Sequence, residues 1–273
     1  MKGTNSILFD LIKLLGGFAL LWVGYAVLWP MVPDSWLPSW MEEDAKIELS
    51  LEQEEKLGEF LVDAFDIATD ENIEWLVDSS LRVIEGRLID HIGGTDYEYK
   101  FHVIDDPTVN ALTLPGGNIV IYTGLIQTSE TPEEVAAVLA HEIGHAEQKH
   151  VIDKLMAELG ISFVMAVVTG GDATLINEIT QTLVSNVFSR HQEREADQYG
   201  LELLERSGVD PRALAAFFRR MNREQLNYPD GLEWMMTHPN NNSRIKASLE
   251  YEIAEGFTSE PFELDWEAVK AAL

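Results

Sequence analysis

The stretch His141-Glu142-Ile143-Gly144-His145 decides how the rest of the sequence is interpreted. On an α-helix, residues four apart lie on one face with their Cβ atoms about 5–6 Å apart, so both imidazoles can reach one divalent ion. The glutamate between them can stand beside the ion without binding it. In this arrangement zinc polarises a water molecule and a carboxylate takes its proton. The alternative is a pair of core histidines that hydrogen-bond to their neighbours without a metal.

The residues before this stretch predict that it lies inside a buried helix. Thr131 suits the N-cap, Pro132 suits the first helical position, and Glu134 stands where a capping box requires it. The apolar side chains that follow have helical spacing, at Val135, Val138, Leu139 and Ile143. The two histidines are therefore expected on a packed helix.

A second polar cluster, from Ser189 to Asp197, is the best source of a further metal ligand. Zinc in a hydrolytic site takes three protein ligands and keeps one open position. Glu193 is the candidate for the third ligand, and Asp197, one turn further on the same face, can accept the free ring N–H of a ligating histidine. Glu195 points elsewhere and is expected to be solvated. The helical pattern runs through Leu183, Val187, Leu201 and Leu204. Without the first motif, this cluster would be interpreted as an ordinary charged helix face.

The pairing of H-E-x-x-H with a downstream E-x-x-x-D resembles the gluzincin metallopeptidases related to the CAAX prenyl protease and to the bacterial proteases HtpX, BepA and LoiP. Three further segments carry the resemblance in the family's order: residues 110–124, residues 208–211, and Thr237-His238-Pro239 with Arg244. The likeness extends roughly from Ser50 to Glu255. It implies an α+β fold, namely a mainly α-helical zincin-like metallopeptidase domain with a small β-sheet.

The predicted activity is hydrolysis of peptide bonds in protein or peptide substrates, with one zinc ion per chain. His141, His145 and Glu193 would bind the ion, and Glu142 would act as the general base. The resemblance implies that His238 or Arg244 helps to stabilise the oxyanion. His238 would instead be a fourth zinc ligand in a resting enzyme, and the sequence leaves both roles open. The remaining histidines are expected to be structural or surface groups: His91, His102, His150 and His191.

The composition narrows the functional classes. The chain has 273 residues and no cysteine, which excludes disulfides, thiolate zinc ligands and a cysteine nucleophile. The formal net charge is −28 at pH 7. Charges cancel within residues 1–40, so the whole excess falls on residues 41–273. Such an acidic domain would repel nucleic acid, which is therefore not expected as a partner.

Residues 1–40 differ in composition from the rest and predict one N-terminal transmembrane helix. Residues 14–29 form an uninterrupted run of apolar residues and glycine, followed by a proline-rich tether. The alternative is a cleaved signal peptide, but no small-x-small cleavage site follows the run. Lys2 and Lys13 precede the span, which predicts a single-pass anchor in the lipid of the cell membrane with the catalytic domain on the periplasmic side. The metallopeptidase domain is expected over residues 41–273.

Periodicity and turn residues predict the other elements. A capping box at Ser50 and Gln53 opens an amphipathic helix to about Ala68, and a second helix is expected over residues 71–85. Strands are expected over residues 98–104, 109–114 and 118–122. The last strand is a candidate edge that would hold an extended substrate peptide, although an ordinary packed hairpin fits as well. The apolar run over residues 161–169 is too short to span a bilayer and favours a core helix over an exposed segment.

Two functions from other classes stay open. A membrane-tethered chaperone or scaffold would carry a latent or structural zinc site, closed by His238 as a fourth ligand. A secreted soluble peptidase would result from removal of residues 1–40. The intact Glu142 favours an enzyme over the scaffold, because a structural site does not need a base. For that enzyme the resemblance implies a role in envelope protein quality control, with misfolded or membrane-associated proteins as substrates.

Overall fold

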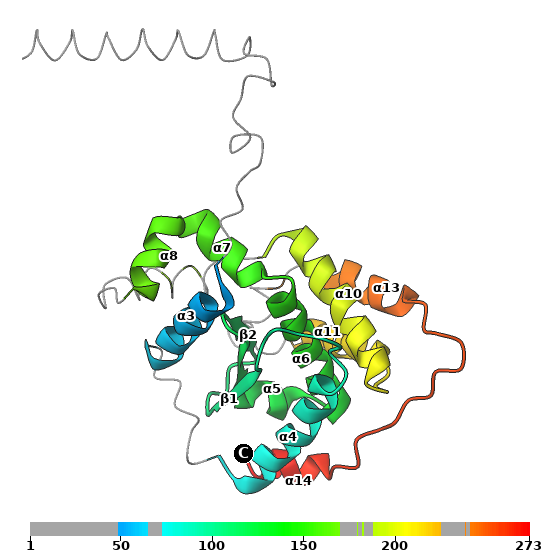
Figure 1. Ribbon diagram of the computed structural model, residues 1–273. Coiled ribbons are helices and arrows are strands. Elements are labelled where there is room, and N and C mark those ends of the chain that lie inside the picture. The colour runs from blue at the N-terminus through cyan, green and yellow to red at the C-terminus, as the bar shows by residue number, and fades with distance from the viewer. Residues whose placement is uncertain are drawn as a thin grey trace, which may run out of the picture. The chain divides into compact units, whose positions relative to one another are not determined.

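A computed structural model gives the fold of the protein (Figure 1). It describes residues 49–64, 73–169, 179, 182, 188–224, 238 and 241–273. The predicted membrane anchor, its tether and the boundary at residue 41 lie outside these residues. Among the residues that are described, no helix combines the length and the apolar character that crossing a bilayer requires. The elements named below all belong to one unit, Leu49–Leu273.

The described residues are mainly helical and contain one small sheet. In chain order the elements are α3 (Leu51–Ala64), α4 (Trp75–Ile89), β1 (Lys100–Ile104), β2 (Ala111–Leu114), β3 (Asn118–Tyr122), α5 (Thr123–Thr128), α6 (Pro132–Glu147), α7 (His150–Leu159), α8 (Ile161–Val168), α10 (Arg190–Arg206), α11 (Arg212–Glu224), α13 (Asn241–Glu250) and α14 (Trp266–Ala271). The α+β class predicted from the sequence is confirmed for this part of the chain.

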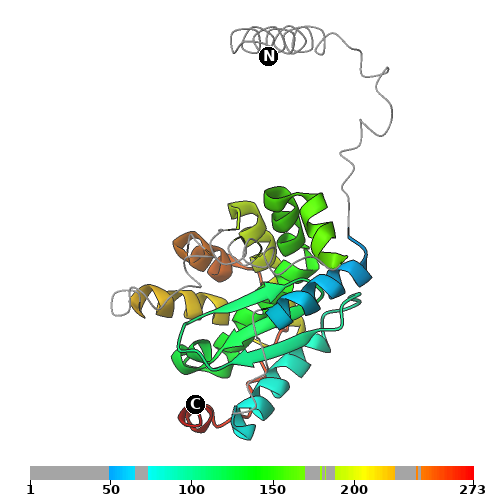
Figure 2. The ribbon, with the colours of Figure 1, turned by 90° about the vertical axis from the view of Figure 1, so that its left-hand side faces the viewer.

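The three strands form one sheet in the order β1-β3-β2 (Figure 2). β1 runs parallel to β3, with Lys100 opposite Asn118, whereas β2 runs antiparallel to β3, with Thr113 opposite Ile119. The prediction that the last strand lies at an edge is therefore wrong. The reason is that β1 pairs with the side of β3 that a simple hairpin would leave open, so that β3 becomes the central strand and β1 and β2 are the edges.

The turn between β2 and β3 depends on two glycines. Gly116 and Gly117 have φ angles of +70° and +74°, a region that residues with side chains rarely adopt. A Cβ atom on Gly116 would also lie 2.7 Å from the Cα atom of Glu55 in α3. The turn thus sets the register of β2 against β3 and allows α3 to pack closely on it.

Helix α6 lies at the centre of the fold. Its apolar residues at the predicted positions are fully buried: Val135, Val138, Leu139 and Ile143. The helix packs against α4, α10, α11 and the edge strand β2. The prediction of a buried helix around the histidine pair is confirmed.

Two glycines allow α6 and α10 to approach each other closely. A Cβ atom on Gly144 of α6 would lie 2.7 Å from the carbonyl oxygen of Ala196 in α10. A Cβ atom on Gly200 of α10 would lie 3.1 Å from the backbone nitrogen of His141. Because larger residues would separate the helices, this contact determines how near α10 can bring its side chains to the histidines.

The start of α6 differs from the prediction in one respect. Thr131 is the N-cap residue, but its side chain makes no capping hydrogen bond. The carboxylate of Glu134 accepts two hydrogen bonds of 2.9 Å from the guanidinium of Arg220 in α11 instead. The capping box predicted here is wrong, because the carboxylate accepts from Arg220 and, at 2.8 Å, from the backbone N–H of Glu130, and not from the N–H of Thr131. The capping box predicted at Ser50 and Gln53 is confirmed. The backbone N–H of Ser50 donates to Oε1 of Gln53 at 2.9 Å, and the backbone N–H of Gln53 donates to Oγ of Ser50 at 3.3 Å.

The apolar run at residues 161–169 forms α8, which packs against α3 and α7. Val164 and Val167 are buried, while the apolar residues on the other side, such as Phe163 and Met165, are partly exposed. The prediction of a core helix therefore holds for one face of α8.

Candidate metal centre

Helix α6 presents both motif histidines toward one point. The ring centroids of His141 and His145 are 4.7 Å apart, and their Nε2 atoms are separated by 3.1 Å. Both side chains are fully buried. Spacing of one helical turn and tight packing on every side therefore hold the two imidazoles as a pair.

Helix α10 brings Glu193 against this pair. Oε1 of Glu193 lies 3.6 Å from Nε2 of His145, and Oε2 lies 3.8 Å from Nε2 of His141. The close contact between the helices at Gly144 makes this approach possible. The carboxylate proposed from the sequence as the third ligand thus faces both imidazoles, although it comes from a distant part of the chain.

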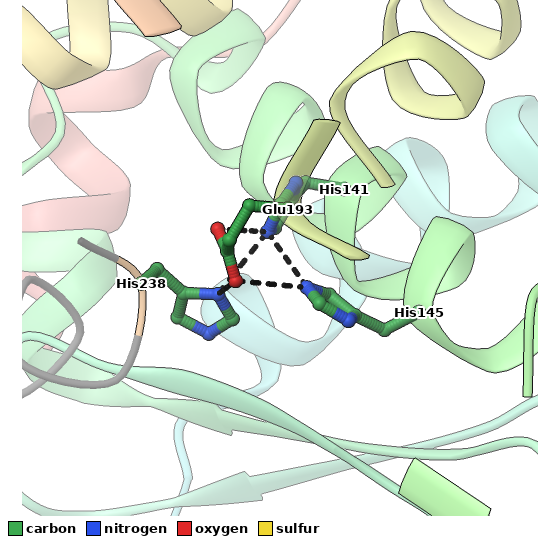
Figure 3. Close-up of side chains that lie close together, drawn as sticks. All are labelled: His141, His145, Glu193 and His238. Atoms are coloured by element: carbon green, nitrogen blue, oxygen red, sulfur yellow. Dashed lines mark hydrogen bonds and ion pairs between the residues drawn. The ribbon is translucent and has the colours of Figure 1, made fainter. Parts of the chain in front are cut away.

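His238 completes a cluster of four side chains (Figure 3). Its Nδ1 atom lies 2.9 Å from Oε1 of Glu193 and 3.3 Å from Nε2 of His141. The ring is buried like the others. Its chain neighbours Thr237 and Pro239 lie outside the described residues, so His238 is the one residue of this segment whose position is described.

A divalent metal ion fits this donor set. The four ligand atoms all lie within 4.8 Å of one another. Tetrahedral zinc, with bonds of about 2.0–2.2 Å, separates its ligand atoms by about 3.3–3.6 Å. The distances from Glu193 to the three histidines, and from His141 to His145 and His238, lie between 2.9 and 3.8 Å and so fall on both sides of that range. Imidazole nitrogen and carboxylate oxygen are also the donors that zinc takes, so both geometry and chemistry suit a metal.

The charges of the cluster suit a cation as well. Burial lowers the pKa of His141 to about 4 and that of His145 to about 3, so each ring is neutral near pH 7 and offers a nitrogen lone pair. Burial alone would raise the pKa of Glu193, but interaction with His238 and Arg244 outweighs it and lowers that pKa well below its usual value. Glu193 is therefore a carboxylate, which supplies negative charge to the centre.

Asp197 and Arg244 form a layer behind the ligands. Oδ1 of Asp197 lies 3.1 Å from Nδ1 of His141, the ring nitrogen that faces away from the cluster. Arg244 of α13 donates to both oxygens of Asp197, and its Nη1 lies 2.6 Å from Oε2 of Glu193. Although burial opposes it, this guanidinium lowers the pKa of Asp197 to about 2. The structure therefore brings together all seven site residues predicted from the sequence.

Glu142 lies beside the cluster with its two oxygens in different surroundings. Oε1 is 3.5 Å from Nε2 of His238. Oε2 is 2.8 Å from the hydroxyl oxygen of Thr113 on strand β2. Thr113 was not identified from the sequence, because its proximity depends on the packing of β2 against α6, which no local pattern encodes.

His150 is a second residue that the sequence analysis underrated. Its Nδ1 lies 3.1 Å from Nδ1 of His145, and its Nε2 lies 3.4 Å from Oε2 of Glu195. It is buried, which agrees with the structural one of the two roles expected for it. Glu195 has 42% of its side-chain area exposed, in agreement with the prediction that it is solvated, and it also pairs with the exposed His191. The sequence spacing carries no signal for this contact, because α6 ends at Glu147 and the chain turns at Lys149, with φ +55°, before His150 begins α7.

Comparison with known proteins identifies the family. Residues 77–252, more than half of the chain, match peptidase family M48. The beta-barrel assembly-enhancing proteases of Yersinia pestis and Escherichia coli (strain K12) are each 28% identical to the chain, over 72% of it and 43% of the relative. The mitochondrial metalloendopeptidase OMA1 of Schizosaccharomyces pombe is 31% identical, over 60% of the chain and 50% of the relative. The chain thus spans about half the length of these curated relatives.

The matched residues include the whole cluster, from His141 on α6 to His238. The relatives are named as proteases, and one carries the word metalloendopeptidase in its name. The resemblance to a metallopeptidase family inferred from the sequence is therefore confirmed. The chain belongs to peptidase family M48.

Proposed function

We propose that the protein is a zinc-dependent endopeptidase that hydrolyses peptide bonds by means of an activated water molecule. The observation that carries this proposal is the position of Glu142, a buried carboxylate beside a cluster of four buried metal donors. Structural zinc sites need only ligands, whereas hydrolytic sites also need a base. The family match supports the same reaction class.

His141, His145 and Glu193 are the proposed zinc ligands. Asp197 accepts the Nδ1–H of His141, which keeps Nε2 of that ring unprotonated and directed into the cluster. Arg244 contacts Asp197 and Glu193 behind the ligands. We therefore assign Arg244 a positioning role in place of the oxyanion role that the sequence left open.

Glu142 is the proposed general base and then the general acid. A bound zinc ion would polarise the substrate carbonyl and lower the pKa of water. Glu142 takes the proton of the attacking water on Oε1, the oxygen on the side of His238. As the new C–O bond forms and the amide C–N bond breaks, Glu142 delivers that proton to the leaving nitrogen.

His238 is proposed to occupy two positions. In the described position its Nδ1 stands among the ligand atoms and would close the coordination of the metal. A hydrolytic site needs one open position, so substrate binding would displace this ring. His238 would then be a fourth ligand in the resting enzyme and, once displaced by substrate, a hydrogen-bond donor to the oxyanion.

Strand β2 is the proposed binding strand for an extended substrate. It is an edge of the sheet and packs on α6, the helix that carries the base. An edge strand offers backbone groups to which a peptide can add as a further strand. The proposed substrates are misfolded or membrane-associated proteins, within protein quality control in the cell envelope.

Residues 1–40 are proposed to anchor the chain in the cell membrane, with the catalytic domain on the periplasmic side. The apolar run of residues 14–29 and the lysines before it support this orientation. Protease added to intact spheroplasts of a bacterial host should degrade the domain. Full protection of the domain would contradict the proposed orientation, and N-terminal sequencing of the mature protein would reveal whether the segment is cleaved.

Replacement of the base tests the proposed reaction. Glu142→Gln should retain the metal content of the wild type while its rate of cleavage of unfolded casein falls by about 10²–10⁴-fold. The matched control is Glu133→Gln, also on α6, whose carboxylate accepts a hydrogen bond from the backbone of Phe262 and lies outside the cluster. The control should cleave at the wild-type rate. Normal cleavage by Glu142→Gln would refute the assignment.

A membrane-tethered chaperone with a structural metal is the second candidate. The observation that favours it is the fourth donor, His238, because four protein ligands close a structural zinc site. A chaperone would suppress aggregation of an unfolded protein equally well as wild type and as Glu142→Gln, and neither form would release cleaved fragments. Fragments from the wild type alone support the peptidase.

A further inference from the structure

We propose that Thr113 is a positioning residue that fixes the orientation of Glu142, an inference that rests on the proposed peptidase function. The hydroxyl oxygen of Thr113 lies 2.8 Å from Oε2 of Glu142. Both side chains are buried, with 5% of Thr113 and 1% of Glu142 exposed. The hydroxyl thus holds one oxygen of the carboxylate and leaves Oε1 on the side of His238, where a proton acceptor is needed.

The same hydroxyl lies 2.7 Å from the backbone carbonyl oxygen of Glu142. A hydroxyl group has one proton to donate and lone pairs to accept with. While Glu142 is a carboxylate, Thr113 can donate to Oε2. When Glu142 holds the proton taken from water on Oε1, Oε2 is still an acceptor, so Thr113 can continue to donate to it. One hydroxyl therefore supports both forms of the base that the reaction requires.

The alternative is that Thr113 serves only to satisfy the carbonyl group of Glu142. That carbonyl lies in the interior of α6, where the N–H group of Ala146, four residues on, is its regular helical partner. The carbonyl therefore does not depend on the hydroxyl. The contact between Thr113 and Oε2, by contrast, is a direct hydrogen bond, and a buried carboxylate oxygen needs one.

The position of Thr113 also links the base to the proposed binding strand. Thr113 belongs to β2, opposite Ile119 of β3, and β2 packs on α6. Side chains leave the faces of a sheet whereas backbone groups point along it to the neighbouring strand, so Thr113 can face α6 without occupying the outer edge of β2. A peptide paired with that edge would be held in a fixed relation to the carboxylate.

Substitution of Thr113 in the full chain tests this inference. Thr113→Val keeps the shape and removes the hydroxyl, and kcat on a quenched fluorescent peptide should fall about 10–100-fold. KM and metal content should stay at their wild-type values. Thr113→Ser restores the hydroxyl and should recover kcat to within a few-fold of the wild type. If the valine variant does not fold, Thr113→Ala removes the same group without added bulk and should show the same loss of kcat.

Thr123 provides the matched control. It is a buried threonine whose hydroxyl also contacts a backbone carbonyl, that of Asp106 at 3.0 Å, and it lies outside the cluster. Thr123→Val should lose stability but keep kcat. If Glu142→Gln inactivates the enzyme but Thr113→Val keeps the wild-type kcat, the role of Thr113 is overturned and the proposed function stands. Failure of the wild type to cleave any substrate would overturn the proposed function itself.

Discussion

Arg244 and Asp197 form a two-point ion pair behind the metal centre. Nε of Arg244 lies 2.8 Å from Oδ2 of Asp197, and Nη2 lies 2.6 Å from Oδ1. Both side chains are buried. Through Asp197 the guanidinium supports His141, and through a second contact it supports Glu193. One cation from α13 thus sets the position of side chains on both α6 and α10.

Arg244→Met should destabilise the protein strongly. Removal of one partner from a buried ion pair leaves the other charge uncompensated and costs about 3–5 kcal/mol of unfolding free energy. Urea unfolding of the metal-free protein measures this loss. Arg212→Met is the control, because Arg212 pairs with Asp210 at the surface, at 3.5 Å. This substitution should change the unfolding free energy by less than about 1 kcal/mol. Equal effects of the two substitutions would contradict the role given to Arg244.

His150→Phe should weaken metal binding. With Nε2 of His145 directed into the cluster, its Nδ1–H needs an acceptor, and Nδ1 of His150 is the group at 3.1 Å. Loss of such a partner lowers metal affinity by about 10–100-fold, as competition with a chelator can measure. His150→Gln retains an acceptor oxygen and should lose less affinity than His150→Phe. An unchanged affinity in the phenylalanine variant would show that His145 does not need this partner.

Gly144→Ala should separate α6 from α10. The added Cβ atom would meet the carbonyl oxygen of Ala196 at 2.7 Å, so the helices must move apart and Glu193 must withdraw from the histidines. Overpacking of this kind costs about 1–3 kcal/mol, and the metal content should fall with it. Gly86→Ala on α4 meets nothing within 4 Å and should stabilise by about 0.5–1 kcal/mol. Thermal unfolding and metal analysis of both variants test this contrast.

Glu85→Gln should stabilise the protein more at pH 8 than at pH 5. Burial raises the pKa of Glu85 to about 7 from an ordinary value of 4.5. Below pH 4.5 the group is neutral in the folded and unfolded chain, whereas above pH 7 it is charged in both and the folded state bears the cost of burial. The gain at pH 8 is at most about 3 kcal/mol before solvent screening reduces it. Urea unfolding at both pH values measures it, and a pH-independent difference would refute the shift.

The sequence predicts the site well where a helix alone decides the geometry. His141 and His145 share a face because they are one turn apart, and the same holds for Glu193 and Asp197 on α10. The start of α10 is less well predicted. The helical pattern was expected to run through Leu183, which lies outside the described residues, whereas α10 itself begins at Arg190 after a capping box at Ser189.

Contacts between distant elements are what the sequence could not supply. Thr113 meets Glu142 because β2 packs on α6, and β3 is the central strand because β1 pairs with its other side. The sequence left His150 open as a structural or a surface group, because its role depends on the position of its ring beside His145. Each of these follows from tertiary packing, for which local periodicity carries no signal.

The location of a bound metal tests the central claim most directly. Crystals of the purified full chain, with data collected on both sides of the zinc absorption edge, would show the ion by its anomalous signal. The proposal predicts one peak about 2.0–2.2 Å from Nε2 of His141, Nε2 of His145 and a carboxylate oxygen of Glu193. A protein that cleaves peptides without a peak at this position, or with its metal elsewhere, would contradict it.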